Sequence, residues 1–217
     1  IGTVAGIMIS QYMGQKNRRE IRRSFYLNLI LAAIMALGFT VVCMVFPKRI
    51  MGLYTKDVST LTVSAGYLRI IAGTFLPIAG ATLLSTMFRC MEKSQLPLYA
   101  SIISAIVNTG LNYILIFGKW GIDGMGADGA AVATLFSQGV NFLAMFVMII
   151  KYRDSLKKQE RTNQNVSRFC WKQYLSMLLP ILVCEALWSL GENVYAAIYG
   201  HMGTDASAAM TLINPIQ

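Results

Sequence analysis

Long apolar runs, separated by short polar segments, restrict what this chain can fold into. Five complete runs cover residues 24–46, 61–88, 98–117, 130–150 and 174–200. Each has about the 20 residues that an α-helix needs to cross the hydrocarbon core of a bilayer. A membrane β-barrel would instead alternate apolar and polar residues in segments of about ten, which these runs do not do. The sequence therefore predicts an all-α, polytopic membrane protein.

Two incomplete apolar segments flank the five spans. Residues 1–14 have the composition of the end of a further helix, and another begins at Ser207. Only 13% of the residues are charged, compared with about 25% in a typical soluble domain. Because the chain starts without methionine, inside an apolar segment, we expect it to be part of a longer protein.

The basic residues predict how the spans are oriented. Of 19 Lys and Arg residues, fourteen lie in three alternate loops, at residues 16–23, 89–93 and 151–172, and four lie in the opposite loops. By the positive-inside rule the three basic loops are cytoplasmic, which predicts a multi-pass protein of the plasma membrane. The formal net charge of +9 is therefore expected at lipid headgroups rather than on a nucleic acid.

Only two of the ten Asp and Glu residues lie inside a span, namely Glu185 and Glu192. On a helix they share one face with Trp188 and Tyr195. A carboxylate inside a bilayer is costly and suggests a functional site, where it can load and release a proton. The two aromatic rings can hold an organic cation through cation–π contacts. Alternatively, Glu185 is structural and forms a hydrogen bond to a neighbouring helix.

A second polar group lies in the spans 98–117 and 130–150. Asn108 and Asn112 are four residues apart and share a helix face, and Thr134 lies in the next span. The two amides can hold helices together. With Thr134 they can also offer carbonyl and hydroxyl oxygens to a hard cation. Both interpretations remain open at this point.

Other motifs do not support an enzyme. Gly124-Met-Gly126-Ala-Asp-Gly129 has the spacing of a dinucleotide-binding loop, but it follows a run too long for a strand and lacks the later acidic residue. We expect these glycines to form a tight external turn and a helix–helix contact. The sequence offers no nucleophile–base pair, no metal-ligand spacing among its cysteines and no nucleotide site. We therefore expect no cofactor and no bound metal, and an ion gradient or a separate subunit as the energy source.

The chain resembles the MATE (multidrug and toxic compound extrusion) family of the MOP flippase superfamily. The residues that carry the resemblance are Gln11-Tyr-Met-Gly14, Tyr67-Leu-Arg69-Ile70, Asn108-Thr-Gly-Leu-Asn112, Gly129-Ala-Ala-Val-Ala-Thr134, Leu179-Pro180, Glu185-Ala-Leu-Trp188 and Gly203-Thr-Asp-Ala206. The resemblance implies a two-lobe antiporter of six plus six helices, of which this chain covers late helix 2 to early helix 8. Residues 1–150 would belong to the N-lobe, 151–172 to the cytoplasmic linker and 173–217 to the start of the C-lobe.

The resemblance also implies roles for individual residues. Glu185 is similar to the seventh-helix glutamate of the bacterial branches, in the ion-coupling and substrate region. Asn108 and Thr134 match an asparagine and a threonine of relatives that have an N-lobe cation site. Asn112 departs from that pattern, because those relatives carry an aspartate there.

The function implied is export of amphipathic, cationic organic molecules by alternating access, driven by H⁺ or Na⁺, by a monomer in the bilayer. One alternative is a flippase for lipid-linked oligosaccharides, which would line its cavity with arginines, whereas only Arg69 lies inside a span here. Another is a membrane scaffold subunit without transport activity. A membrane enzyme would need a catalytic cluster outside this sequence.

Overall fold

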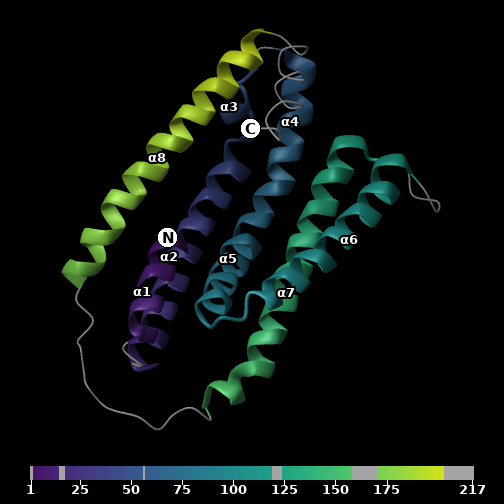
Figure 1. Cartoon of the computed structure of the whole chain (residues 1–217). Helices are drawn as coiled ribbons and strands as arrows, with labels where there is room; N and C mark the ends of the chain where they lie inside the picture. The colour runs from purple at the N-terminus through teal and green to yellow at the C-terminus, as the bar shows by residue number, and fades with distance from the viewer. Residues whose placement is uncertain (1, 15–17, 56, 119–123, 158–170, 203–217) are drawn as a thin grey trace.

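The computed structural model describes residues 2–14, 18–55, 57–118, 124–157 and 171–202, all in helices or short connections (Figure 1). No strand occurs in these ranges, which confirms the all-α prediction. The elements are α1 (Gly2–Gly14), α2 (Arg18–Val45), α3 (Pro47–Met51), α4 (Val58–Ile71), the 3₁₀ turn η1 (Ala72–Thr74), α5 (Phe75–Cys90), α6 (Gln95–Phe117), α7 (Gly126–Lys157) and α8 (Trp171–Met202). The span expected from Ser207 and most of the expected linker lie outside these ranges.

Five segments are long and apolar enough to cross a membrane, which confirms the predicted multi-pass topology. They are Glu20–Val45, Val58–Cys90, Gln95–Phe117, Gly126–Lys151 and Tyr174–Tyr199. Large apolar side chains on their outer faces are exposed, for example Ile34 at 60% and Phe136 at 62%. A surface of this kind suits lipid tails, which are as apolar as the side chains themselves.

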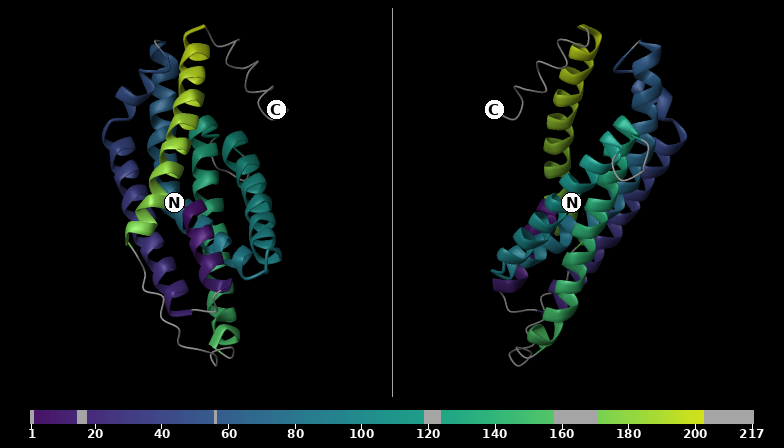
Figure 2. Two further views of the ribbon diagram at one scale, coloured as in Figure 1. Left: turned by 60° about the vertical axis from the view of Figure 1, so that its left-hand side comes forward. Right: turned by 90° about the vertical axis from the view of Figure 1, so that its right-hand side faces the viewer.

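The helices form a flattened bundle in which α8 lies at one edge and α6 and α7 lie at the other (Figures 1 and 2). Between these edges, α2 packs on α5, and α1 packs on both of them. In Figure 1 the end of α5 and the start of α8 lie towards the lower end of the bundle, as do the start of α2 and the end of α7. The helix ends that flank the three basic loops therefore share one side, as the charge count predicts.

The second span is interrupted near its middle. Pro77 has no N–H to donate to the carbonyl of residue 73, and the chain tightens into η1 directly before α5. The hydroxyl of Thr40, on α2, donates to the Ala72 carbonyl oxygen at 3.0 Å. This bond contacts the interrupted segment at Ala72, next to the Gly73 carbonyl that Pro77 leaves without its helical donor.

Glycines at the two ends of the segment between α6 and α7 end one helix and allow close packing of the pair. Gly118 ends α6 with a φ of 67°, in the left-handed region that favours glycine. A Cβ at Gly129 would lie 2.7 Å from the Leu115 carbonyl oxygen, so only glycine allows α6 and α7 to approach here. Gly129 confirms the expected helix–helix contact, and residues 119–123 of the expected turn lie outside the described residues. α7 begins at Gly126, four residues earlier than expected, and continues to Lys157, beyond the expected end at residue 150.

Candidate functional site

The acidic face predicted for α8 is the continuation of a packing stripe. α8 runs without interruption from Trp171 to Met202, through Pro180, so the helical spacing used above holds. Tyr174, Leu178 and Ile181 precede Glu185 at alternating steps of four, three and four residues. With 3.6 residues per turn, Glu185 points within about 20° of the direction of Tyr174. The same stripe then passes through Trp188, Glu192 and Tyr195.

The inner end of this stripe packs on α1 and α2. Tyr174 is 1% exposed and forms a buried cluster with Val4 and Met8, against which Leu178 and Ile181 also pack. The Tyr174 hydroxyl donates to Oδ1 of Asn28 at 3.0 Å. Nδ2 of Asn28 in turn donates to the Ser24 carbonyl oxygen at 2.8 Å, and Asn28 and Ser24 are both fully buried.

A second attachment lies near the outer end of α8. The Tyr54 hydroxyl, between α3 and α4, donates to Oδ1 of Asn193 at 2.5 Å. Beyond the first attachment the site face is open: Trp188 is 72% exposed, Tyr195 is 59% exposed, and Glu185 and Glu192 are also exposed. Glu185 is thus accessible to a ligand, and the structural alternative of a hydrogen bond to a neighbouring helix has no support among the bonds of the described residues.

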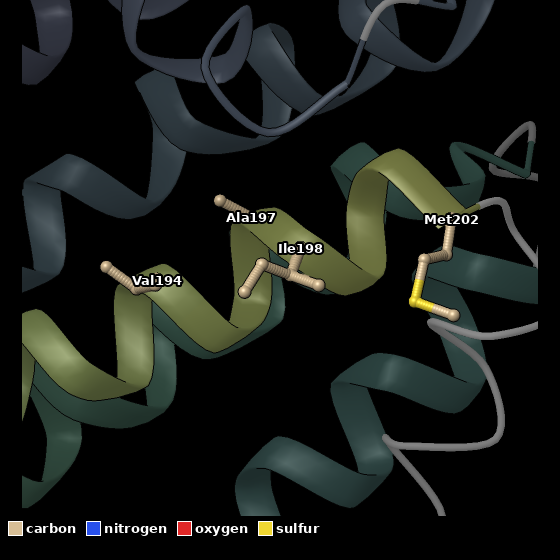
Figure 3. Close-up of a pocket in the computed structure, with 4 residues that line it drawn as sticks. All are labelled: Val194, Ala197, Ile198 and Met202. Atoms are coloured by element: carbon tan, nitrogen blue, oxygen red, sulfur yellow. The ribbon is translucent and has the colours of Figure 1, made fainter.

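The hollow shown in Figure 3 lies on another side of the same helix. It has a volume of about 460 Å³ and is lined by Val194, Ala197, Ile198 and Met202. Val194 is two residues beyond Glu192, which places it on the opposite side of the helix. The lining is apolar and includes none of the predicted site residues, so this hollow is not the predicted binding site.

The second predicted group forms a connected hydrogen-bond chain between α6 and α7. Nδ2 of Asn112 donates to Oδ1 of Asn108 at 3.0 Å. Nδ2 of Asn108 donates to the Ser137 hydroxyl at 3.1 Å, and that hydroxyl donates to the Thr134 carbonyl oxygen at 2.9 Å. The Thr134 hydroxyl itself donates to the Ala130 carbonyl oxygen. Thr134 therefore enters the chain through its backbone rather than its side chain.

Both interpretations of the asparagine pair find support in this geometry. Asn108 joins α6 to α7 through Ser137, which confirms a role in holding the two helices together. Oδ1 of Asn112 is buried and has no hydrogen-bond partner among the described residues. It is therefore a free carbonyl oxygen inside the bundle, as a cation ligand must be.

The predicted residues form two separate groups. In Figure 1, α8 lies at one edge of the bundle, and α6 and α7 lie at the other. Sequence reasoning missed four buried polar residues that organise these groups, and these are Ser24, Asn28, Ser104 and Ser137. The one sequence signal that these four residues share is that each is a polar residue inside an apolar run. Ser137 carries a second signal, because it lies three residues after Thr134 and therefore near the same helix face.

An all-α bundle with five segments that can span a membrane, and with polar residues inside those segments, defines a polytopic membrane protein. The MatE family model matches residues 1–114, more than half of the 217 residues, and the chain belongs to this family. The resemblance read from its motifs is thereby confirmed.

Individual relatives agree with this assignment. The chain is 28% identical over 222 residues to the "Probable multidrug resistance protein YoeA" of Bacillus subtilis (strain 168), covering 100% of this chain and 47% of that protein. It is 25% identical over 185 residues to the "Probable multidrug resistance protein NorM" of Bacillus anthracis, covering 80% and 39%. The chain thus spans about half the length of these relatives or less.

A solved structure shows the same fold. It is described as the inward-facing conformation of a multidrug resistance MATE family transporter of the MOP superfamily. The match has a TM-score of 0.65 at 19% identity and covers 82% of this chain and 40% of that chain.

Proposed function

We propose that this chain forms part of a secondary antiporter of the plasma membrane, which exports amphipathic, cationic organic molecules in exchange for H⁺ or Na⁺. The observation that carries the proposal is the position of Glu185 on α8. It is the next residue on the stripe where α8 packs against α1 and α2, and it is the twelfth residue of the 26-residue span Tyr174–Tyr199. An accessible carboxylate at this depth, on the face that turns towards the rest of the bundle, supports an ion or substrate site.

One carboxylate is sufficient for exchange in this mechanism. A coupling cation and a cationic substrate compete for Glu185, because both are stabilised by the same negative charge. Binding of the coupling cation releases the substrate, and binding of the substrate releases the cation. The two lobes then change their orientation while Glu185 holds only one of these two species. The exposed rings of Trp188 and Tyr195 lie on the same face and can hold the organic part of the substrate by cation–π contact.

The polar chain between α6 and α7 supports a second ion site. Its free acceptor, Oδ1 of Asn112, lies in the part of the chain assigned to the N-lobe, away from Glu185. We assign Asn108 and Asn112 to ion coupling in that lobe and Thr134 to the backbone anchor of the chain. Glu192, two turns beyond Glu185, is assigned to the outer part of the substrate path.

The proposal is tested with the full-length protein in proteoliposomes. Efflux of a cationic dye is followed under an imposed H⁺ gradient and, separately, an imposed Na⁺ gradient. The variants are Glu185→Gln, which removes the charge at nearly constant shape, and Glu92→Gln as the matched control in an exposed turn. We expect gradient-driven efflux in the wild type and the control, and its loss in Glu185→Gln.

Other outcomes would contradict the proposal. Equal efflux in the wild type and Glu185→Gln would remove this carboxylate from the mechanism. Absence of wild-type efflux with either ion would contradict drug export, and flipping of a lipid-linked oligosaccharide would then be measured in the same vesicles. A scaffold subunit predicts a third result, in which Glu185→Gln alters the binding of a partner protein and no flux depends on it.

A further inference from the structure

A small apolar groove lies between α2, α5 and α7 and belongs to neither polar group described above. It has a volume of about 100 Å³ and is lined by Leu29, Ala32 and Ala33 of α2, Ala79 and Gly80 of α5, and Phe142 of α7. Alanine and glycine form most of its floor, and the Phe142 ring lies directly over Gly80. At its rim Leu76 is 44% exposed, so the groove is open to its surroundings.

The groove faces away from α1 and from the acidic face of α8. A Cβ at Gly2 of α1 would lie 3.2 Å from the Thr82 methyl group of α5, so α1 packs on that side of α5. Thr82 is two residues after Gly80 and therefore points to nearly the opposite side of the helix. Because α8 packs beside α1 through Tyr174, the groove is separate from the proposed substrate site.

Three helices agree on the depth of the groove in the membrane. Leu29, Gly80 and Phe142 lie nine or ten residues from the ends of their spans on the side of the basic loops. At 1.5 Å per residue this is about 14–15 Å, which is half of a hydrocarbon core of about 30 Å. The groove therefore lies at the level where the acyl chains of the cytoplasmic leaflet end.

A cation lies on the same stripe of α2 at the cytoplasmic surface. Arg22, Tyr26, Leu29 and Ala33 follow one another at steps of four, three and four residues, so they share one face of the helix. Arg22 is exposed, two residues into the span that begins at Glu20, and the Tyr26 ring is 53% exposed between it and the groove. Ala33 is eleven residues beyond Arg22, or about 16 Å. A molecule held at Arg22 therefore needs a chain as long as one leaflet to fill the groove.

We infer that this face of α2 binds an anionic phospholipid of the cytoplasmic leaflet, with its phosphate at Arg22 and one acyl chain in the groove over Gly80. Basic positions at the cytoplasmic ends of membrane helices bind anionic headgroups. An apolar hollow takes up hydrocarbon rather than water. The lipid would fill the space between α2 and α7 above α5, which packs on both of them. The inference concerns neither the coupling ion nor the exported substrate.

The test measures lipid binding without requiring transport. The full-length protein in detergent is heated with increasing concentrations of long-chain phosphatidylglycerol, and the unfolding midpoint is recorded. A ligand that binds the folded state raises this midpoint as its concentration rises. Phosphatidylcholine with the same chains tests the headgroup, because it has no net charge. Dioctanoyl phosphatidylglycerol tests the groove, because its chains are too short to reach from Arg22 to Ala33.

Each part of the site has a variant and a matched control. Arg22→Gln removes the cation, and Arg89→Gln is its control, on an exposed arginine nine residues after Gly80 and on the opposite side of α5. Ala33→Leu fills the groove. Ala105→Leu is its control, on an exposed alanine of α6 that does not line the groove.

We expect long-chain phosphatidylglycerol to stabilise the wild type at a lower concentration than either of the other two lipids. Arg22→Gln should raise its half-maximal concentration about fivefold, the factor that corresponds to about 1 kcal/mol per basic residue at a membrane surface. Arg89→Gln should leave that concentration unchanged. Ala33→Leu should remove the advantage of long chains over short ones, and Ala105→Leu should keep it.

Several results would overturn the inference. Equal half-maximal concentrations of phosphatidylglycerol and phosphatidylcholine in the wild type, or equal effects of Arg22→Gln and Arg89→Gln, would contradict the phosphate site. An advantage of long chains that survives Ala33→Leu would show that another surface, or another part of the full-length chain, occupies the groove. If Ala33→Leu does not fold, the comparison of chain lengths in the wild type and the Arg22→Gln series still decide the result. Dye efflux tests the proposed function separately, so the two can fail independently.

Discussion

The Tyr174 hydroxyl donates to Oδ1 of Asn28 at 3.0 Å and so joins two residues that lie 146 positions apart in the sequence. The bond ties the start of α8 to α2. Both residues are buried, and the Tyr174 ring also packs on Val4 and Met8 of α1. Tyr174 lies on the side that the basic loops mark as cytoplasmic, eleven residues before Glu185 on the same stripe. The contact therefore sets where the site face of α8 begins.

Replacing Tyr174 with Phe should destabilise this contact. The ring keeps its packing, but Oδ1 of Asn28 loses its donor in a buried position, which costs about 1–3 kcal/mol. We expect a lower thermal unfolding midpoint for the full-length protein in detergent. Tyr26→Phe, on the 53% exposed Tyr26 of α2, is the matched control and should leave the midpoint unchanged. Equal midpoints for all three proteins would show that the bond contributes nothing to stability.

Gly80→Ala should separate α5 from α7. A Cβ at Gly80 would overlap the Phe142 ring, with Cδ2 of that ring at 2.8 Å. Overpacking of this kind costs about 1–3 kcal/mol, so we expect the unfolding midpoint to fall. Phe142→Leu, combined with Gly80→Ala, should recover part of the loss because the smaller side chain makes room. Gly38→Ala serves as the control, since nothing lies within 4 Å of that Cβ, and a similar loss there would contradict the steric explanation.

Trp188→Ala should weaken the binding of cationic substrates more than that of neutral ones. Trp188 is 72% exposed on the Glu185 face, and a cation–π contact contributes about 0.5–2 kcal/mol. At about 1.4 kcal/mol per factor of ten, the half-saturating concentration of a cationic dye should rise roughly 2- to 30-fold in the proteoliposome efflux assay. A neutral dye of similar shape is the comparison. If both dyes weaken equally, Trp188 contributes apolar contact area and not charge recognition.

Asp57 should make the start of α4 sensitive to acid. Its carboxylate accepts hydrogen bonds from the Ser59 and Thr60 hydroxyls and from the Thr60 N–H. These bonds, led by that from Ser59, hold the pKa of Asp57 well below its usual range. A lowered folded-state pKa contributes stability above the unfolded pKa of about 3.9 and loses it as the pH falls through the folded value.

The effect is measured as the difference in unfolding midpoint between the wild type and Asp57→Ala across pH. We expect Asp57→Ala to be less stable by a constant amount from pH 7 down to about pH 5. Below about pH 4 the difference should shrink, because the unfolded wild type takes up a proton that the folded protein does not. Asp57→Asn, which cannot be protonated but still accepts a hydrogen bond, should show a difference that does not depend on pH. A constant difference for Asp57→Ala at all pH values would contradict the assignment.

Several features were predictable because they depend only on the order of residues along one helix. The five spans follow from the length and apolarity of their runs, and the orientation follows from the positions of Lys and Arg. The common face of Glu185 and Trp188 follows from the helical repeat, since α8 continues through Pro180. The end of α6 at Gly118 also follows from local sequence, because this glycine adopts a backbone conformation that other residues rarely take.

Only the tertiary structure decided which faces meet. Ser137 and Asn28 are polar residues inside apolar runs, and nothing in the sequence marks Asn108 or Tyr174 as their partners. Which residues become partners depends on how α6 rests on α7 and how α8 rests on α2, and lipid-exposed and packed apolar faces look alike in sequence because both are apolar. The sequence by itself determined that Glu185 and Asn112 are polar residues within spans. The packing decided that they belong to two separate groups at opposite edges of the bundle.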